Sequence, residues 1–153
     1  MHSDIHKLLL ILDHYECWEY PRGHKKKKAM KEIEQIKNEF ESLLNVSLDL
    51  DRYVEDASFL TDLGLIEERI VNQRKIRIYP FCFRFSNFGR LFTLIGELSE
   101  GTSKKYQLDS LTKRIEQKGF VFIPYEELDT LYNGINQPPY KGFTWWTRYF
   151  DYL

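Results

Sequence analysis

The sequence predicts a single α+β domain, residues 1–153, with about five helices and a small antiparallel sheet. Three observations lead to this fold class. Apolar residues recur with helical spacing in several separate segments, whereas residues 74–85 alternate as strands do. The chain is 42% hydrophobic and 29% charged, which is ordinary for a globular fold and sufficient for a buried core. No repeat, low-complexity tract or linker divides it.

Two helices are expected in the N-terminal third. Ser3 can cap the first, which carries Ile5, Leu8, Leu9 and Leu12 on one face and is ended by the turn residues 20–23. The second follows Lys28 and has the clearest amphipathic pattern, because its apolar residues are three or four positions apart. These residues are Ala29, Ile33, Ile36, Phe40, Leu43 and Leu44.

The C-terminal third predicts three more helices and one buried strand. Apolar spacing indicates a helix over residues 108–119, and residues 120–123 fit a buried strand. Pro124 suits the start of a helix over residues 125–132. Aromatic residues lie on every side of a helix at 143–153, so we expect this tail to pack against the domain.

Residues 48–101 have the element order of a winged helix-turn-helix. Residues 49–63 predict a short helix capped by Gly64, and residues 67–86 predict a hairpin. Pro80 cannot donate to a strand ladder, so a bulge or an edge position is expected there. Residues 86–101 fit either a helix or, over residues 90–95, a strand, and we favour the helix.

The charges of this segment are of the wrong sign for reading DNA. Its presumed outer face carries carboxylates opposed only by Arg52, and a phosphate backbone would repel them. An acidic surface can instead steer and bind a basic protein surface. The predicted partner-binding residues are Glu55, Asp56, Asp62, Glu67 and Glu68.

Bulk composition narrows the classes of partner and compartment. The net charge of −1 provides no general basic field, so binding of nucleic acid is not expected. No segment has the roughly 20 apolar residues that cross a bilayer, so no membrane partner is expected. Cys17 and Cys82 are too few for a disulfide framework and lie in apolar surroundings, which favours a soluble cytoplasmic protein with free thiols.

Motifs for catalysis or metal binding are not evident. His2 and His6 have the spacing of two ligands on one helix face, as do His14 and Cys17, but zinc needs three or four converging ligands. Asp13 and His14 could act as an acid and a base for a nucleophile, but the sequence contains no recognisable nucleophile motif. We therefore expect no enzyme, no metal and no cofactor.

Residues 25–28 are four consecutive lysines. Such a run can bind phosphates, or it can be the solvated start of the following helix, although lysines oppose the helix dipole there. The solvated interpretation is favoured.

Residues 118–125 resemble the signature strand of RNA recognition motifs, in which Phe120 and Phe122 would stack on bases. Val121 replaces the small residue of that pattern. The roughly 20 residues before this strand are also too few for the helix and strand that should precede it. A buried strand is the favoured interpretation.

Three segments resemble small bacterial immunity proteins of contact-dependent inhibition and other polymorphic toxin systems. They are residues 84–93, residues 119–134 and the C-terminal sequence Trp145-Trp-Thr-Arg-Tyr-Phe-Asp-Tyr-Leu153. The resemblance implies a cytoplasmic protein that binds one cognate toxin domain, often a nuclease, and blocks its active site. No site residue is carried over from that group, because its members are structurally diverse.

The alternative function is a winged helix-turn-helix transcriptional regulator. In that case Arg74, Lys75 and Arg77 in the hairpin would contact phosphates. The sequence leaves the toxin and the oligomeric state open.

Overall fold

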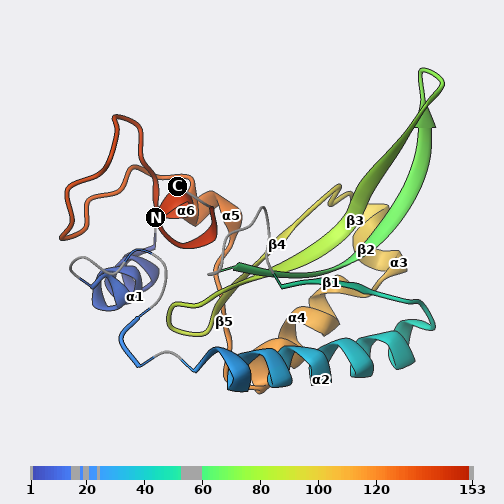
Figure 1. Cartoon of the computed structure of the whole chain (residues 1–153), viewed down its shortest axis with the longest axis horizontal. Helices are drawn as coiled ribbons and strands as arrows, with labels where there is room; N and C mark the ends of the chain where they lie inside the picture. Colours follow the sequence, from blue (N-terminus) through green and yellow to red (C-terminus); the bar gives the residue numbers. More distant parts are fainter. Residues whose placement is uncertain (1, 15–17, 19–20, 24, 53–59, 152–153) are drawn as a thin grey trace.

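The computed structural model describes residues 2–14, 18, 21–23, 25–52 and 60–151 of the chain. Within these residues six helices accompany a five-stranded mixed sheet, which confirms the predicted α+β class (Figure 1). The strands are β1 (Asp49–Asp51), β2 (Leu60–Val71), β3 (Arg74–Ser86), β4 (Leu91–Ile95) and β5 (Val121–Phe122). The helices are α1 (Ser3–Leu12), α2 (Lys26–Leu44), α3 (Glu100–Lys105), α4 (Leu108–Gln117), α5 (Tyr125–Leu128) and α6 (Trp145–Phe150).

The sheet has the strand order β1-β2-β3-β4-β5. The first four strands pair antiparallel, as predicted, but β5 pairs with β4 in parallel, with Leu91 opposite Val121. A parallel neighbour needs a crossover connection. Here the chain between β4 and β5 passes through α3 and α4, so the sheet is mixed instead of purely antiparallel.

The predicted helix over residues 49–63 is wrong. Both described ends of this segment are strands, β1 and the start of β2, while residues 53–59 lie outside the described part. Leu60 and Leu63 are three residues apart, which suggested one helix face, but in a strand they point to opposite faces. Both are buried because the sheet is covered on both sides here. Gly64, expected to cap the helix, is paired with Asp49 and Cys82 inside the sheet.

The favoured helix over residues 86–101 is also wrong, and the strand alternative is correct, since β4 occupies residues 91–95. Left-handed backbone interrupts the segment at both ends of β4. Arg90 has φ 57° and Gly96 has φ 122°, and the interior of a right-handed α-helix contains no positive φ angles. A Cβ on Gly96 would lie 2.7 Å from the carbonyl oxygen of Tyr79, so glycine is required there. The winged-helix interpretation of residues 48–101 fails because these segments are strands.

The predicted hairpin is confirmed and is longer than expected. Strands β2 and β3 pair from Leu60–Ser86 to Val71–Arg74. Asn72 and Gln73 form its two-residue turn with φ values of 50° and 63°, as a type I′ turn requires. The register shifts beside Pro80, which confirms the predicted bulge. The distal half of the hairpin projects well away from the body of the molecule (Figure 1).

Two apolar clusters hold the layers together. Helices α2 and α4 pack beneath the sheet (Figure 1), where Phe40 of α2 contacts the ring of Phe83. The second cluster packs α1, α5 and α6 against Phe88, Leu91 of β4 and Ile123. Trp145, Tyr149 and Phe150 of α6 are fully buried in it, which confirms that the aromatic tail packs against the domain.

Helices α2 and α4 match their predicted positions closely. The helix predicted at 125–132 is shorter and ends at Leu128, and α1 begins one residue earlier than expected, with His2 at its cap position. Among the described residues, no helix combines the length and the apolar character needed to cross a membrane.

Candidate functional site

Asp62, a predicted partner-binding residue, lies inside the protein. It is only 4% exposed, and its two carboxylate oxygens accept hydrogen bonds of 2.8 Å from Nε and Nη2 of Arg84. Burial raises the pKa of Asp62, and the bonds from Arg84 act in the opposite direction. The expectation that Asp62 lies on an exposed face is therefore wrong, because its position in β2 places it opposite Arg84 across the sheet.

The two other predicted acids that the structure describes, Glu67 and Glu68, do not form a free acidic face. Glu67 accepts hydrogen bonds from Arg69 at 3.4 Å and from the Tyr106 hydroxyl at 3.2 Å. Glu68 forms an ion pair with Lys75 across the hairpin. Glu67 and Glu68 also point to opposite faces of the ribbon, since they are consecutive strand residues. Glu55 and Asp56 lie outside the described residues.

The projecting part of the hairpin, residues 68–77, is the most prominent exposed feature of the fold, and we call it the arm. All ten of its residues are exposed. Ile70 is 81% exposed, and Val71 and Ile76 are also exposed. Arg74 and Arg77 form no ion pair with any described residue, whereas Lys75 is paired with Glu68. The arm thus combines apolar side chains with two uncompensated cations.

The two faces of the arm differ in their surroundings. Cross-strand pairing places Glu68, Ile70, Lys75 and Arg77 on one face. The opposite face turns toward the body, because Arg69 on it donates a 2.8 Å hydrogen bond to Glu97. Beyond residue 64 on β2 and before residue 82 on β3, the sheet pairings of β1 and β4 do not reach the hairpin. The carbonyl of Tyr79 accepts a 3.1 Å hydrogen bond from the backbone N–H of Glu97. No described strand pairs with the outer edges of the arm itself, which can therefore accept another strand.

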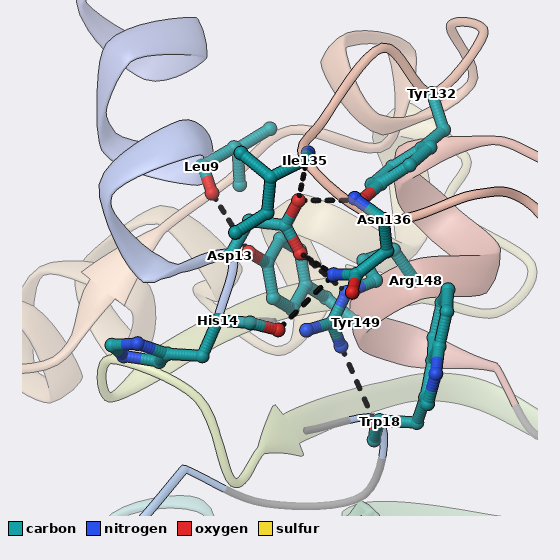
Figure 2. A network of polar contacts seen from close by, with 9 residues as sticks. All are labelled: Leu9, Asp13, His14, Trp18, Tyr132, Ile135, Asn136, Arg148 and Tyr149. Carbon is teal, nitrogen blue, oxygen red and sulfur yellow. Dashed lines mark hydrogen bonds and ion pairs between the residues drawn. The ribbon is translucent and has the colours of Figure 1, made fainter. Parts of the chain in front are cut away.

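A buried polar network, shown in Figure 2, joins the two ends of the chain. Asp13 follows α1 and Arg148 lies in α6, and their side chains form a 2.8 Å ion pair with no exposed surface on either. The second oxygen of Asp13 accepts hydrogen bonds from the Tyr132 hydroxyl and from the backbone N–H of Ile135. These bonds join the end of α1 to residues 132–148, which lie more than 100 positions later in the sequence.

Asn136 and Arg148 donate further hydrogen bonds within this network. Asn136 donates to the carboxylate of Asp13 and to the carbonyl of His14, both at 3.1 Å. Arg148 donates to the carbonyl of Trp18 and lies over the ring of Phe88, 4.6 Å from its centroid. The side chain of Asp13 thus has no exposed surface, and its oxygens are directed at groups of the protein. No sequence motif connects positions 13 and 148, and only the fold reveals the pair.

The histidines and the RNA-like segment have structural contacts. His2 lies 3.6 Å from Glu127, and His6 makes a 2.9 Å hydrogen bond with Asn133, so the two imidazoles have separate partners. In the part of the chain that the structure describes, no cluster of three or more His, Cys, Asp or Glu residues could hold a metal ion. Phe120 is buried beneath the guanidinium of Arg90, 4.1 Å from its ring centroid, so its face is not open to a base.

A basic cavity lies where α2 begins, beside the ends of β2 and β3. Its volume is about 170 Å³, and lysines of the predicted basic run contribute to its wall. The first turn of α2 starts at Lys26, so the run is indeed the start of a helix, as expected. Lys25, Lys27 and Lys28 are exposed, as the solvated interpretation expects, and Lys25, Lys26 and Lys28 also border this hollow.

Alkaline pH is expected to destabilise the fold. Burial raises the pKa of Cys82 well above its ordinary value of 9.0, and burial also raises the pKa values of Tyr79, Tyr132 and Tyr149 above 10.0. The folded protein keeps these protons while the unfolded chain releases them. The free energy of unfolding should therefore fall above about pH 9, by about 1.4 kcal/mol per pH unit for each group beyond its unfolded pKa.

Urea unfolding at about pH 7.5, 9 and 10.5 measures this effect. Cys82→Ala should remove the contribution that begins lowest in pH, whereas Tyr140→Phe, at an exposed side chain, should leave the profile unchanged. A stability that stays constant to about pH 10.5 would contradict the burial of these groups.

Comparisons with protein-family models, curated proteins and solved structures found no significant match to this chain. Any function must accordingly be argued from the geometry and the sequence themselves.

Proposed function

We propose that this chain is an immunity protein that neutralises a cognate bacterial toxin domain by stoichiometric binding, with the arm as part of its contact surface. The observation that carries the proposal is the 81% exposure of Ile70, on the face of the arm opposite to the one from which Arg69 reaches Glu97. A two-stranded ribbon is only marginally stable by itself in water. Apolar residues at its tip gain their burial energy when a partner covers them.

The resemblance of three C-terminal segments to immunity proteins supports the class of partner. The charges of the arm change the expected sign of charge on the partner surface that it contacts. Because Asp62, Glu67 and Glu68 are compensated within the chain, while Arg74 and Arg77 are not, the arm suits an acidic or neutral surface better than a basic phosphate-binding face. Neutralisation of a nuclease by mimicry of phosphate is thus not supported by the described residues.

The arm supplies only part of a complete interface. A specific interface typically buries about 800 Å² on each partner and involves about 20–30 residues on each side. The ten arm residues are fewer than this. The toxin domain would therefore contact the neighbouring body as well, and the arm would provide its apolar anchor.

The direct test is co-expression with the toxin domain encoded beside this chain. We expect cells that produce the toxin domain to grow only when this protein is present, and the purified pair to form a complex of fixed stoichiometry in calorimetry. Neither protection nor a complex would be seen if the proposal is incorrect.

Ile70→Asp is expected to weaken binding of the toxin domain by at least about 30-fold, or about 2 kcal/mol, because a charge would enter the apolar anchor. The matched control is Ile11→Asp on α1, where the side chain is 73% exposed but lies outside the arm. Both variants should unfold within about 0.5 kcal/mol of the parent. Weaker binding by Ile11→Asp alone would move the contact surface to α1.

Nucleic acid is the second candidate ligand, and the uncompensated Arg74 and Arg77 favour it. A two-stranded β-ribbon can enter a DNA groove without a winged helix. In this case duplex DNA would bind with a steep salt dependence, and reversing Arg74, Lys75 and Arg77 to glutamate would abolish the binding. Toxin binding with no salt-dependent DNA binding would exclude this candidate.

A further inference from the structure

The basic cavity at the start of α2 carries a second inference, independent of the arm. Its wall combines three elements that are distant in sequence: the first turns of α2, the first residues of β2 and the end of β3. The polar residues that matter to the argument are Lys25, Lys26, Lys28, Thr61, Ser86 and Arg90. The hollow of about 170 Å³ is thus built by the tertiary fold and is more than a run of surface lysines.

The charge of the cavity wall is positive. Its carboxylate is Glu32, which already accepts a 2.6 Å bond from Nη1 of Arg90. Arg90 also donates to the carbonyls of Gly119 and Lys118, so each of its three nitrogens has a protein partner. Lys25 and Lys28 are exposed and form no ion pair with a described residue. Their ammonium groups remain available for an anion.

The helix end adds to this field. Helix α2 has 19 residues, no side-chain cap at Lys25 and no acidic residue in its first turn. Lysines at this end oppose the helix dipole, and the first backbone N–H groups have no intrahelical acceptor. An anion in the cavity would compensate both, as anions bound at helix N-termini do in other proteins.

Two buried hydroxyls in the cavity wall each have one protein partner and keep further hydrogen-bonding capacity. Thr61 is 5% exposed, and its only partner among the described residues is the thioether sulfur of Met30, at 3.5 Å. A thioether is a weak acceptor, so this hydroxyl is poorly satisfied for a buried group. The Ser86 hydroxyl oxygen accepts a bond from the backbone N–H of Phe88 and keeps its own hydrogen free to donate. Both hydroxyls belong to residues of the cavity wall.

We propose that this cavity binds the phosphate group of a small ligand through Lys25 and Lys28, with hydrogen bonds from the hydroxyls of Thr61 and Ser86. Its size supports a small ligand. A drug-sized molecule usually needs about 300–1,000 Å³, whereas one water occupies about 30 Å³. The cavity lies between these values and admits a tetrahedral anion with its immediate substituent.

Calorimetry at constant ionic strength tests the site with three probes: inorganic phosphate, ribose 5-phosphate and adenosine monophosphate. We expect saturable binding of at least one of them with one site per chain. Tighter binding of phosphate alone identifies the free anion as the ligand, and tighter binding of either ester identifies a phosphorylated small molecule. Absence of saturable binding for all three would overturn the proposal.

The double variant Lys25→Gln and Lys28→Gln should weaken the binding about tenfold, which corresponds to about 1.4 kcal/mol. Lys27→Gln is the matched control, because Lys27 belongs to the same helical turn but does not line the cavity. An equal loss in the control would mean that only the general charge of the lysine run attracts the anion, and the site would be refuted.

Thr61→Val tests the buried hydroxyl at nearly constant shape. We expect weaker phosphate binding with an unchanged unfolding midpoint, and recovery of binding in Thr61→Ser. Amide signals of Thr61, Ser86 and Lys28 should shift in NMR spectra as phosphate is added. Shifts confined to other parts of the chain would place the anion elsewhere and overturn the assignment.

Discussion

Asp13→Asn should lower the free energy of unfolding by about 3–5 kcal/mol, which is the cost typical of removing one partner of a buried ion pair. The substitution keeps the shape of the side chain but leaves the guanidinium of Arg148 buried without its counter-charge. Small domains are stable by only about 5–15 kcal/mol, so this variant would lose a large part of its stability. Urea unfolding at neutral pH measures the loss.

A second substitution separates charge from packing at this pair. Arg148→Met introduced into Asp13→Asn should restore part of the lost stability, because an apolar side chain removes the uncompensated charge. Glu100→Gln serves as the control, since its ion pair with Lys104 is highly exposed and should contribute less than about 1 kcal/mol. A double variant less stable than Asp13→Asn would show that the charge of Arg148 is compensated by other groups.

Asp62→Asn should reduce the free energy of unfolding by about 3 kcal/mol and leave partner binding by the folded protein unchanged. The reason is the same as for Asp13, because Arg84 loses the carboxylate that receives two of its donors. The effect should be smaller than at Asp13, since Arg84 keeps a 3.0 Å bond to the carbonyl of Phe150 and is slightly exposed.

Glu68→Gln is the appropriate comparison for Asp62→Asn. Glu68 is a half-exposed acid of the same predicted cluster, paired with Lys75 on the arm, and its neutralisation should change stability by less than about 1 kcal/mol. Thermal unfolding and calorimetry with the toxin domain measure both variants. Normal stability with loss of binding in Asp62→Asn would reinstate Asp62 as a contact residue.

The helices whose positions were predicted correctly have one dry face and one wet face. In α2, Ile33, Ile36 and Phe40 are buried while the lysines and glutamates between them remain at the surface. Such a helix requires only that its apolar stripe face a core, whatever that core contains. The long hairpin was predictable because apolar side chains recur at every second position in residues 74–79 and 81–85, which is the period of a strand.

The segments that were predicted incorrectly are covered on both sides. Around Leu60 and Leu63, burial on both faces of the sheet removes the alternation that identifies a strand. In residues 91–95 the run is apolar except for the buried Thr93, and a short run of this kind is compatible with helix or strand. The choice was made by pairing with β3, which is a contact between distant residues.

By itself, the sequence determined the α+β class, the amphipathic helices, the long hairpin and the inward packing of the aromatic tail. These depend on local periodicity, turn residues and the hydrophobic effect, which act over a few positions at a time. Only the tertiary structure decided which charged side chains are exposed and which are buried in ion pairs. Asp62 is internal because Arg84 lies opposite it across the sheet, and Asp13 is internal because the chain returns after 135 residues with Arg148. The same fold leaves Ile70, Arg74 and Arg77 exposed on the arm, since no part of the described body reaches that far.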